Sequence, residues 1–406
     1  MKAKFQFSDS PVDQIAKSIA AQMMNRRRLL QVSGLSLTAA AVAACGVGGD
    51  SDSSGLTDVE DLSDTEKVVD WSNWVAYIDV DEDAGTNPTL DEFEAETGIS
   101  INYIEDYNDN NEFFAKVRPL LQNGQAIDRD IVTPTDWMAG QWISLGFAQT
   151  LNYDNIPNRS NLYPDLVDVS FDPGRVYTLP WQGGYGGLGW NKAKVQELTG
   201  SDQLMDLDDL FNPALKGRIS VLSEMRETIG CILSHQGANP SDFTSDQFYN
   251  AIDYLGAQIS SGQIRQVTGN DYLAALESGD IIAAIGWSGD VAQLGDDFQF
   301  AVPAGGGILW TDNVLIPVGA KHKKNAELVM NYYYEPEIAA RVAAYVQYIT
   351  PVNGAREEIV KIDPSLADNS LIFPTDDDLA IVKPFMLLDA DTEKEYQDAF
   401  QAIIGN

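Results

Sequence analysis

Three short segments of the chain place tryptophan or carboxylates close together, two of them beside glycine. They are Gly286–Asp290 (GWSGD), Gly306–Asp312 (GGILWTD) and Ser223–Glu227 (SEMRE). The face of an indole ring attracts an ammonium group, and a carboxylate supplies the opposite charge. Together these residue types predict a binding site for an organic cation.

The positions of these residues favour a ligand site over core packing. Trp287 and Trp310 each follow a run typical of a buried strand and stand beside glycine. Because ligands of α/β proteins bind at the carboxyl ends of strands, we expect both rings to line a cleft. Glu224 is expected to hold ligand charge. Glu227 has three readings: a ligand contact, an acidic first helical turn, or a local partner of Arg226.

The side chains needed for nucleophilic or metal chemistry are scarce. His235 follows an apolar helix, and His322 lies in the run 321–324 (KHKK), which we expect to be solvated. Neither has the partner spacing of a metal site or a catalytic triad. Cys231 stands in an apolar run, which predicts a buried, inert thiol. We expect a binding protein without cofactor or metal. A secreted carbohydrate hydrolase with two carboxylates and tryptophan platforms is the alternative enzyme class.

The charge of the chain excludes several partners. Its 406 residues carry a formal charge of −35. Such a surface repels nucleic acid and anionic lipid, so no nucleic-acid partner is expected. Solubility or a salty habitat explains most of this charge, because 61 acidic residues cannot all serve one site.

Residues 1–44 have the pattern of a Tat-type lipoprotein signal peptide. Arg26–Arg28 precede the modestly apolar run Leu29–Ala44, which ends in Val42–Cys45 (VAAC), a sequence similar to a bacterial lipobox. The run is shorter than the roughly 20 residues that a spanning helix needs, which disfavours a transmembrane anchor. The sequence leaves open whether translation starts at Met1 or near Met23.

Cys45 is therefore the predicted lipidation site and the first mature residue. Residues 45–66 are rich in Gly, Ser and Asp, which predicts a flexible tether. A tether after a lipidated cysteine predicts an extracytoplasmic protein, held at the membrane by its N-terminal lipid.

From residue 67 onward, strand and helix patterns alternate, which predicts an α/β fold with mostly parallel sheets. The expected elements are strands 68–71, 99–103, 130–132, 218–222 and 281–285, and helices 88–97, 110–123, 136–145, 227–236 and 247–260. Two Gly-rich crossings, 179–189 and 302–310, separate two such units and predict a hinge between lobes. We expect lobe 1 to comprise residues 67–182 with 311–355, and lobe 2 to comprise residues 183–310 with 356–406.

Five motifs, in order along the chain, carry a family resemblance. They are Trp71–Tyr77 (WSNWVAY), Asp130–Trp137 (DIVTPTDW), Gly286–Gly289 (GWSG), Gly307–Asp312 (GILWTD) and Tyr348–Asn353 (YITPVN). From about Val68 to Phe400 the chain resembles the spermidine/putrescine-binding proteins of bacterial ABC importers. The resemblance implies a two-lobe periplasmic-binding-protein-like fold with hinge-linked mixed or parallel sheets and a ligand cleft between the lobes.

The same resemblance assigns residues to the cleft. Trp74, Tyr77, Trp137, Trp287, Trp310 and Tyr348 would line it, the hydroxyl of Thr135 would contact an amine, and Glu224, Glu227 and Asp312 would hold ammonium groups. The implied ligand is spermidine, putrescine or both, and permease subunits are the implied partners of a monomer. Another small organic cation or an amino acid derivative is the alternative cargo.

Overall fold

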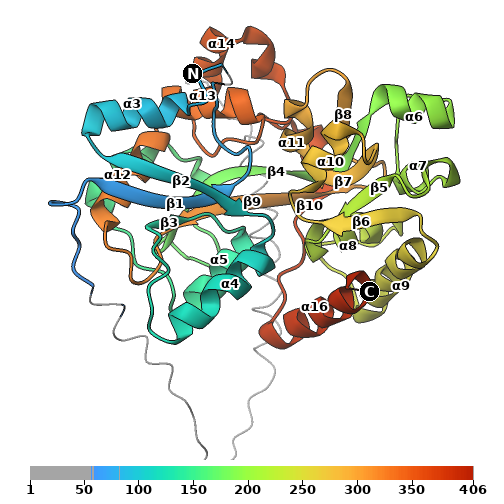
Figure 1. Cartoon of the computed structure of the whole chain (residues 1–406), viewed down its shortest axis with the longest axis horizontal. Helices are drawn as coiled ribbons and strands as arrows, with labels where there is room; N and C mark the ends of the chain where they lie inside the picture. Colours follow the sequence, from blue (N-terminus) through green and yellow to red (C-terminus); the bar gives the residue numbers. More distant parts are fainter. Residues whose placement is uncertain (1–55, 57–58, 82, 406) are drawn as a thin grey trace, which may run out of the picture.

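The computed structural model describes residue 56 and residues 59–81 and 83–405. The predicted signal peptide, Cys45 and most of the predicted tether lie outside the described residues. Two lobes stand side by side and share one mixed sheet (Figure 1). Within the part of the chain that the structure describes, no helix has the length and apolar character needed to cross a membrane.

Lobe 1 is built on three parallel strands and the helices that pack against them. These elements are β1 (Val68–Trp74), β2 (Ser100–Tyr107), β3 (Ile131–Val132), α3 (Pro88–Thr97), α4 (Asn110–Gln122), α5 (Asp136–Ser144) and α12 (Lys323–Tyr333). Helix α3 has proline in its first turn and ends at Gly98, whose φ of 70° suits glycine. Helix α4 is capped by the Asp109 carboxylate, which accepts from two backbone N–H groups.

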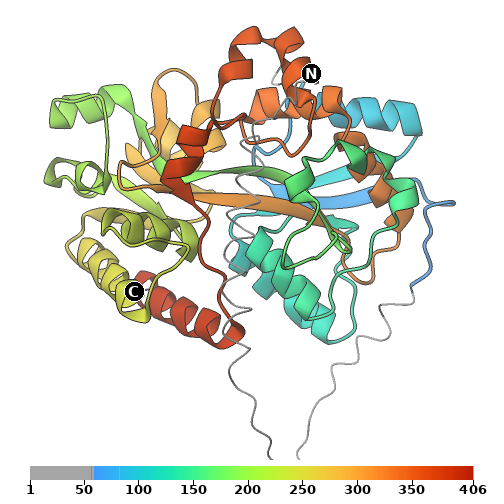
Figure 2. The same cartoon turned by 180° about the vertical axis from the view of Figure 1, so that it is seen from behind.

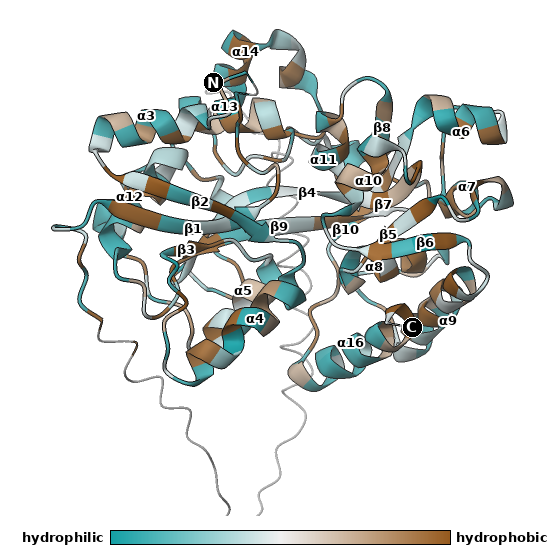
Figure 3. Ribbon diagram, in the orientation of Figure 1, coloured by the Kyte–Doolittle hydropathy of each residue, from teal (hydrophilic) through white to brown (hydrophobic). Residues whose placement is uncertain are grey.

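Lobe 2 repeats this plan with its own strands and helices. They are β5 (Ile219–Leu222), β6 (Ile264–Thr268), β7 (Ala283–Trp287), β8 (Phe298–Ala301), α6 (Lys192–Thr199), α7 (Leu207–Leu210), α8 (Met225–His235), α9 (Ser245–Ser260), α10 (Tyr272–Ser278), α11 (Ser288–Gln293) and α16 (Ala390–Ile404). Four further elements are α13 (Pro336–Val346), α14 (Ala355–Ile362), α15 (Asp376–Ile381) and β10 (Val382–Lys383). Hydrophobic residues predominate in strands such as β5, whereas hydrophilic residues cover much of outer helices such as α16 (Figure 3).

Two antiparallel strands, β4 (Thr178–Asn191) and β9 (Gly307–Leu315), run through both lobes (Figure 2). The sheet order is β2-β1-β3-β9-β4-β7-β5-β6, so β9 pairs with lobe 1 and β4 with lobe 2. The first Gly-rich crossing therefore lies within a strand and the second leads into one, and the sheet is mixed rather than mostly parallel. The glycines make room for aromatic rings, because a Cβ at Gly184 would lie 2.6 Å from the ring of Trp310. The predicted lobe boundaries at residues 182/183 and 310/311 fall within these two strands, and the one at 355/356 falls at the start of α14.

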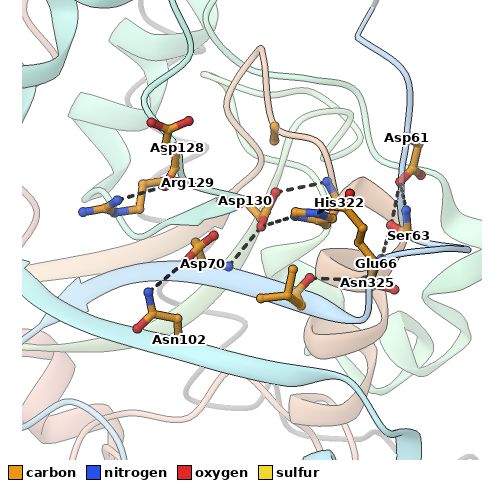
Figure 4. A network of polar contacts seen from close by, with 12 residues as sticks. Asp61, Ser63, Glu66, Asp70, Asn102, Asp128, Arg129, Asp130, His322 and Asn325 are labelled. Atoms are coloured by element: carbon orange, nitrogen blue, oxygen red, sulfur yellow. Dashed lines mark hydrogen bonds and ion pairs between the residues drawn. The ribbon is translucent and has the colours of Figure 1, made fainter.

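The predicted solvated position of His322 is wrong, because its ring is buried in a polar network (Figure 4). Nδ1 lies 2.9 Å from Oδ2 of Asp130, and Nε2 lies 3.0 Å from Oε2 of Glu66. Burial lowers the pKa of the ring, but the bonds to Glu66 and Asp130 outweigh it, and the net pKa is raised. The backbone of Leu62 also donates to the carbonyl of Lys321. The end of the predicted tether is thus packed against lobe 1.

Candidate ligand-binding site

A cavity lies between the lobes, at the strands that join them. The empty space within it, which includes space open to solvent, is about 350 Å³. It is lined by Trp74, Val75, Tyr77, Asn110, Thr135, Glu224, Glu227, Asn270, Trp287, Asp290, Trp310, Asp312 and Tyr348. The structure therefore brings together every predicted site residue except Trp137.

Asp312 lies in the middle of β9 and faces the cavity from lobe 1. Its Oδ1 accepts from the Thr135 hydroxyl at 2.6 Å, and its Oδ2 accepts from the Tyr77 hydroxyl at 2.9 Å. Burial raises its pKa to about 8, although both hydroxyls favour the charged form. These partners are neutral, so they orient the carboxylate without balancing its charge.

Glu224 reaches the cavity from lobe 2, because β5 ends at Leu222 and α8 begins at Met225. Its Oε1 accepts from the backbone N–H of Asn110 at 2.6 Å and from the side-chain amide of Asn110 at 2.9 Å. Asn110 belongs to α4 of lobe 1, so these bonds cross between the lobes. Burial, together with the nearby charges of Asp109 and Glu227, raises the pKa of Glu224 well above its ordinary value.

Glu227 lies one turn further along α8, and its Oε2 is buried without a hydrogen-bond partner. Burial raises its pKa to about 7. The guanidinium of Arg226 forms its ion pair with Glu393 and not with Glu227. Arg226 therefore makes no direct ion pair with Glu227, although its charge lowers the pKa of Glu227. Glu227 does lie in the first turn of α8, and its free oxygen is available to a ligand donor.

Asp290 is a fourth cavity carboxylate that the sequence reasoning did not select. Its Oδ1 accepts from Tyr348 at 2.6 Å, and its Oδ2 accepts from Asn270 at 2.8 Å and from Tyr272 at 3.0 Å. Burial raises its pKa to about 6. The GWSGD motif could have predicted this residue, because Asp290 lies in the first turn of α11, directly after the strand that ends at Trp287. Asn110 and Asn270 carried no comparable local pattern.

Aromatic rings form the walls between these carboxylates. Trp74 meets Trp287 edge to face, with ring centroids 5.6 Å apart, and Trp310 meets Tyr348 in the same way at 5.3 Å. Tyr77 and Tyr348 are 5.2 Å apart. Such walls accept methylene groups on their ring surfaces and ammonium groups over their faces.

Trp137 does not line the cavity, contrary to the prediction. Thr135 precedes α5 and points to Asp312, whereas Trp137 lies two residues further on, within the helix. Residues two apart on a helix do not face the same side, so the ring turns away from the cavity. It lies instead against the guanidinium of Arg226, 3.8 Å from the ring centroid.

The site as a whole is acidic, apolar between its acids, and unsuited to a metal ion. No lysine or arginine is among the described residues that line it. In the described ranges, no group of three or more His, Cys, Asp or Glu side chains is arranged to hold a metal. Cys231 is buried on α8, as predicted, and burial raises the pKa of its thiol. This arrangement can hold an organic cation that carries several amine groups.

Comparisons with known proteins agree with this architecture. A family model described as bacterial extracellular solute-binding protein matches residues 89–373. The putrescine-binding periplasmic protein PotF of Escherichia coli (strain K12) is 27% identical over 333 residues, covering 78% of this chain and 85% of that protein. The putrescine-binding periplasmic protein SpuD of Pseudomonas aeruginosa is 28% identical over 346 residues, covering 81% and 89%.

A solved structure gives the same result for the fold. The putative spermidine/putrescine ABC transporter from Listeria monocytogenes superposes with a TM-score of 0.70 at 25% identity, covering 83% of this chain and 99% of that chain. The predicted two-lobe α/β class is thereby confirmed.

Proposed function

Because the chain belongs to the bacterial extracellular solute-binding protein family, we propose that it captures a polyamine, spermidine or putrescine, for an ABC importer. This family consists of binding proteins and not of enzymes, which confirms the expectation of a non-enzymatic role. The hydrolase alternative is set aside on the same ground. The polyamine and the importer are suggested by the names of the relatives and by the chemistry of the cavity.

The observation that carries the proposal is the set of cavity acids. Glu224, Glu227, Asp290 and Asp312 are all buried, and their hydrogen-bond partners are neutral. Burying negative charge without a counter-charge is costly, so an occupant that brings positive charge gains most. A chain of ammonium groups separated by methylenes supplies charge to the acids and apolar surface to the rings.

Other cargo classes fit this cavity less well. A neutral sugar would leave the acids unbalanced, and an anion would be repelled by them. A small organic cation or a cationic amino acid derivative shares the required charge and is the second candidate class. It differs from a polyamine in the number and spacing of its positive groups, so a panel of ligands distinguishes the two classes.

The test is a thermal-shift panel followed by calorimetric titration. Putrescine, spermidine, arginine, choline, glucose and glutamate are compared at equal concentration. We expect the two polyamines to raise the unfolding temperature most and to bind saturably. Stabilisation by glucose or glutamate with none by the polyamines would contradict the proposal.

We also propose that the protein acts outside the cytoplasm, anchored by a lipid on Cys45. The VAAC sequence after three arginines supports this, and the relatives PotF and SpuD are periplasmic proteins. Intact-mass analysis of membrane-extracted protein should give a lipidated chain that begins at Cys45. A Cys45→Ser variant should lose the lipid mass. A mature wild type that starts elsewhere would contradict the anchor.

A further inference from the structure

The lobes also meet outside the cavity, around the side chain of Arg226. This residue lies on α8 of lobe 2, and its guanidinium faces the ring of Trp137 on α5 of lobe 1 at 3.8 Å from the centroid. Its Nη1 donates to Oε1 of Glu393 at 3.1 Å, and its Nη2 pairs with Oε2 of the same carboxylate. None of the three residues lines the ligand cavity.

The geometry is well suited to fixing a guanidinium. Glu393 binds it through both carboxylate oxygens, which sets the plane of the group as well as its position. Glu393 lies in the first turn of α16, where the helix dipole favours a carboxylate. Arg226 is buried, with 7% of its surface exposed, so Glu393 and the indole face take the place of water in stabilising its positive charge.

Two of the three side chains belong to lobe 2 and the third belongs to lobe 1. Arg226 and Glu393 both belong to lobe 2, where α16 packs on α9 through the stacked rings of Tyr396 and Phe248, 3.7 Å apart. Their ion pair therefore persists when the lobes separate. The contact with Trp137 exists only while the lobes are together, because α5 belongs to lobe 1.

We propose that Trp137, Arg226 and Glu393 form a latch that holds the lobes closed and slows ligand release. Trp137 and Arg226 make the closing contact, and Glu393 is a positioning residue that presents the guanidinium to the indole. Ligand meets the open form, so the latch acts on dissociation and leaves association almost unchanged.

The test follows the release of radiolabelled spermidine chased with excess unlabelled spermidine. The choice of spermidine rests on the proposed function. Replacing Trp137→Ala should raise the dissociation rate about fivefold to thirtyfold, which corresponds to about 1–2 kcal/mol at about 1.4 kcal/mol per factor of ten. Trp137→Phe keeps a ring face and should show a smaller effect.

Glu393→Gln tests the positioning role against a matched control on the same helix. It should raise the dissociation rate because the guanidinium loses its bidentate partner. Glu395→Gln makes the same change of charge, but Glu395 bonds to Tyr249 within lobe 2, so its dissociation rate should stay at the wild-type value. Urea unfolding of each variant verifies that the fold is intact.

Two results would overturn the latch. One is a Trp137→Ala variant that is folded and releases spermidine at the wild-type rate. The other is a Glu393→Gln variant that behaves like Glu395→Gln. A wild type that binds no polyamine contradicts the proposed function instead, so the two failures are distinguishable.

Discussion

Replacing Gly269 by alanine should prevent full closure of the lobes while leaving each lobe folded. Gly269 follows β6 of lobe 2 and lies against Asn108, which follows β2 of lobe 1. A Cβ at Gly269 would lie 1.9 Å from the carbonyl oxygen of Asn108 and 2.7 Å from its carbonyl carbon. Both are backbone atoms that cannot rotate away. The φ of Gly269 lies outside the left-handed region, so alanine is not strained within lobe 2.

The expected loss of affinity follows from the two hydrogen bonds that the close approach of Gly269 to Asn108 allows. Asn270 N donates to Asn108 O at 2.9 Å, and Asp271 N donates to Asn108 Oδ1 at 3.1 Å. A carbon and a carbonyl oxygen rest about 3.3–3.6 Å apart, so the backbones must separate by more than about 1 Å. Both bonds then exceed hydrogen-bonding distance. At about 0.5–1.5 kcal/mol each, the loss is about 1–3 kcal/mol, or roughly 5-fold to 150-fold in affinity.

Calorimetric titration with spermidine measures this loss. Gly256→Ala is the control. Gly256 lies on α9, away from the lobe contact, and a Cβ there would meet only Ile403, at an ordinary van der Waals distance of 3.8 Å. Small-angle scattering at saturating ligand should also give a larger radius of gyration for Gly269→Ala than for wild type. A folded Gly269→Ala variant with wild-type affinity and radius would refute the reasoning.

Three further predictions concern the cavity acids. Asp312→Asn should weaken polyamine binding at least tenfold, because one partner of a buried charge pair is lost; Asp79→Asn, which changes a buried acid of lobe 1 that accepts from Thr89 outside the cavity, should bind almost as wild type in the same titration. Glu227→Gln should weaken spermidine more than putrescine in competition titrations, since a third ammonium group loses its partner; an equal loss for both would contradict this. In urea unfolding, the stability of the ligand-free protein should fall as pH rises from 6 to 8.5, because burial raises the pKa values of Asp290, Glu227 and Asp312 to about 6, 7 and 8. The folded state then binds more protons than the unfolded chain, and this stabilisation is lost as the three acids ionise. A stability that rises over this pH range would be inconsistent with those shifts.

The sequence predicted the elements whose signals are local. Proline at position 88 and glycine at position 98 mark the ends of α3, and the structure places the helix at Pro88–Thr97. Glu224 and Glu227 follow β5, Trp287 is the last residue of β7, and all three line one cavity. Residues at the end of a strand take their direction from it, which explains why this part of the site was predictable. Trp310 also lines the cavity but lies inside β9, not after a strand as predicted.

The parts that were missed depend on contacts between distant segments. Glycine disfavours strands, so β4 was predicted as a loop, yet Gly184 is required by the side chain of Trp310 on the neighbouring strand. Trp137 was placed in the cavity by the family resemblance, and its actual partner, Arg226, lies on a helix that is distant in the sequence. His322 read as solvated because its partners Glu66 and Asp130 lie about 190 residues or more away in the sequence. No local pattern contains that information.

The central claim is that buried cavity carboxylates bind a cation. The direct measurement is the number of protons released when putrescine binds at pH 7, from calorimetric titrations in two buffers of different ionisation enthalpy. Putrescine has aliphatic amines that stay charged at this pH, whereas Asp312 and Glu227 are partly protonated in the free protein because burial raises their pKa. The cation favours their charged forms, so we predict a net release on the order of one proton per ligand. Binding without proton release, or with proton uptake, would contradict the claim.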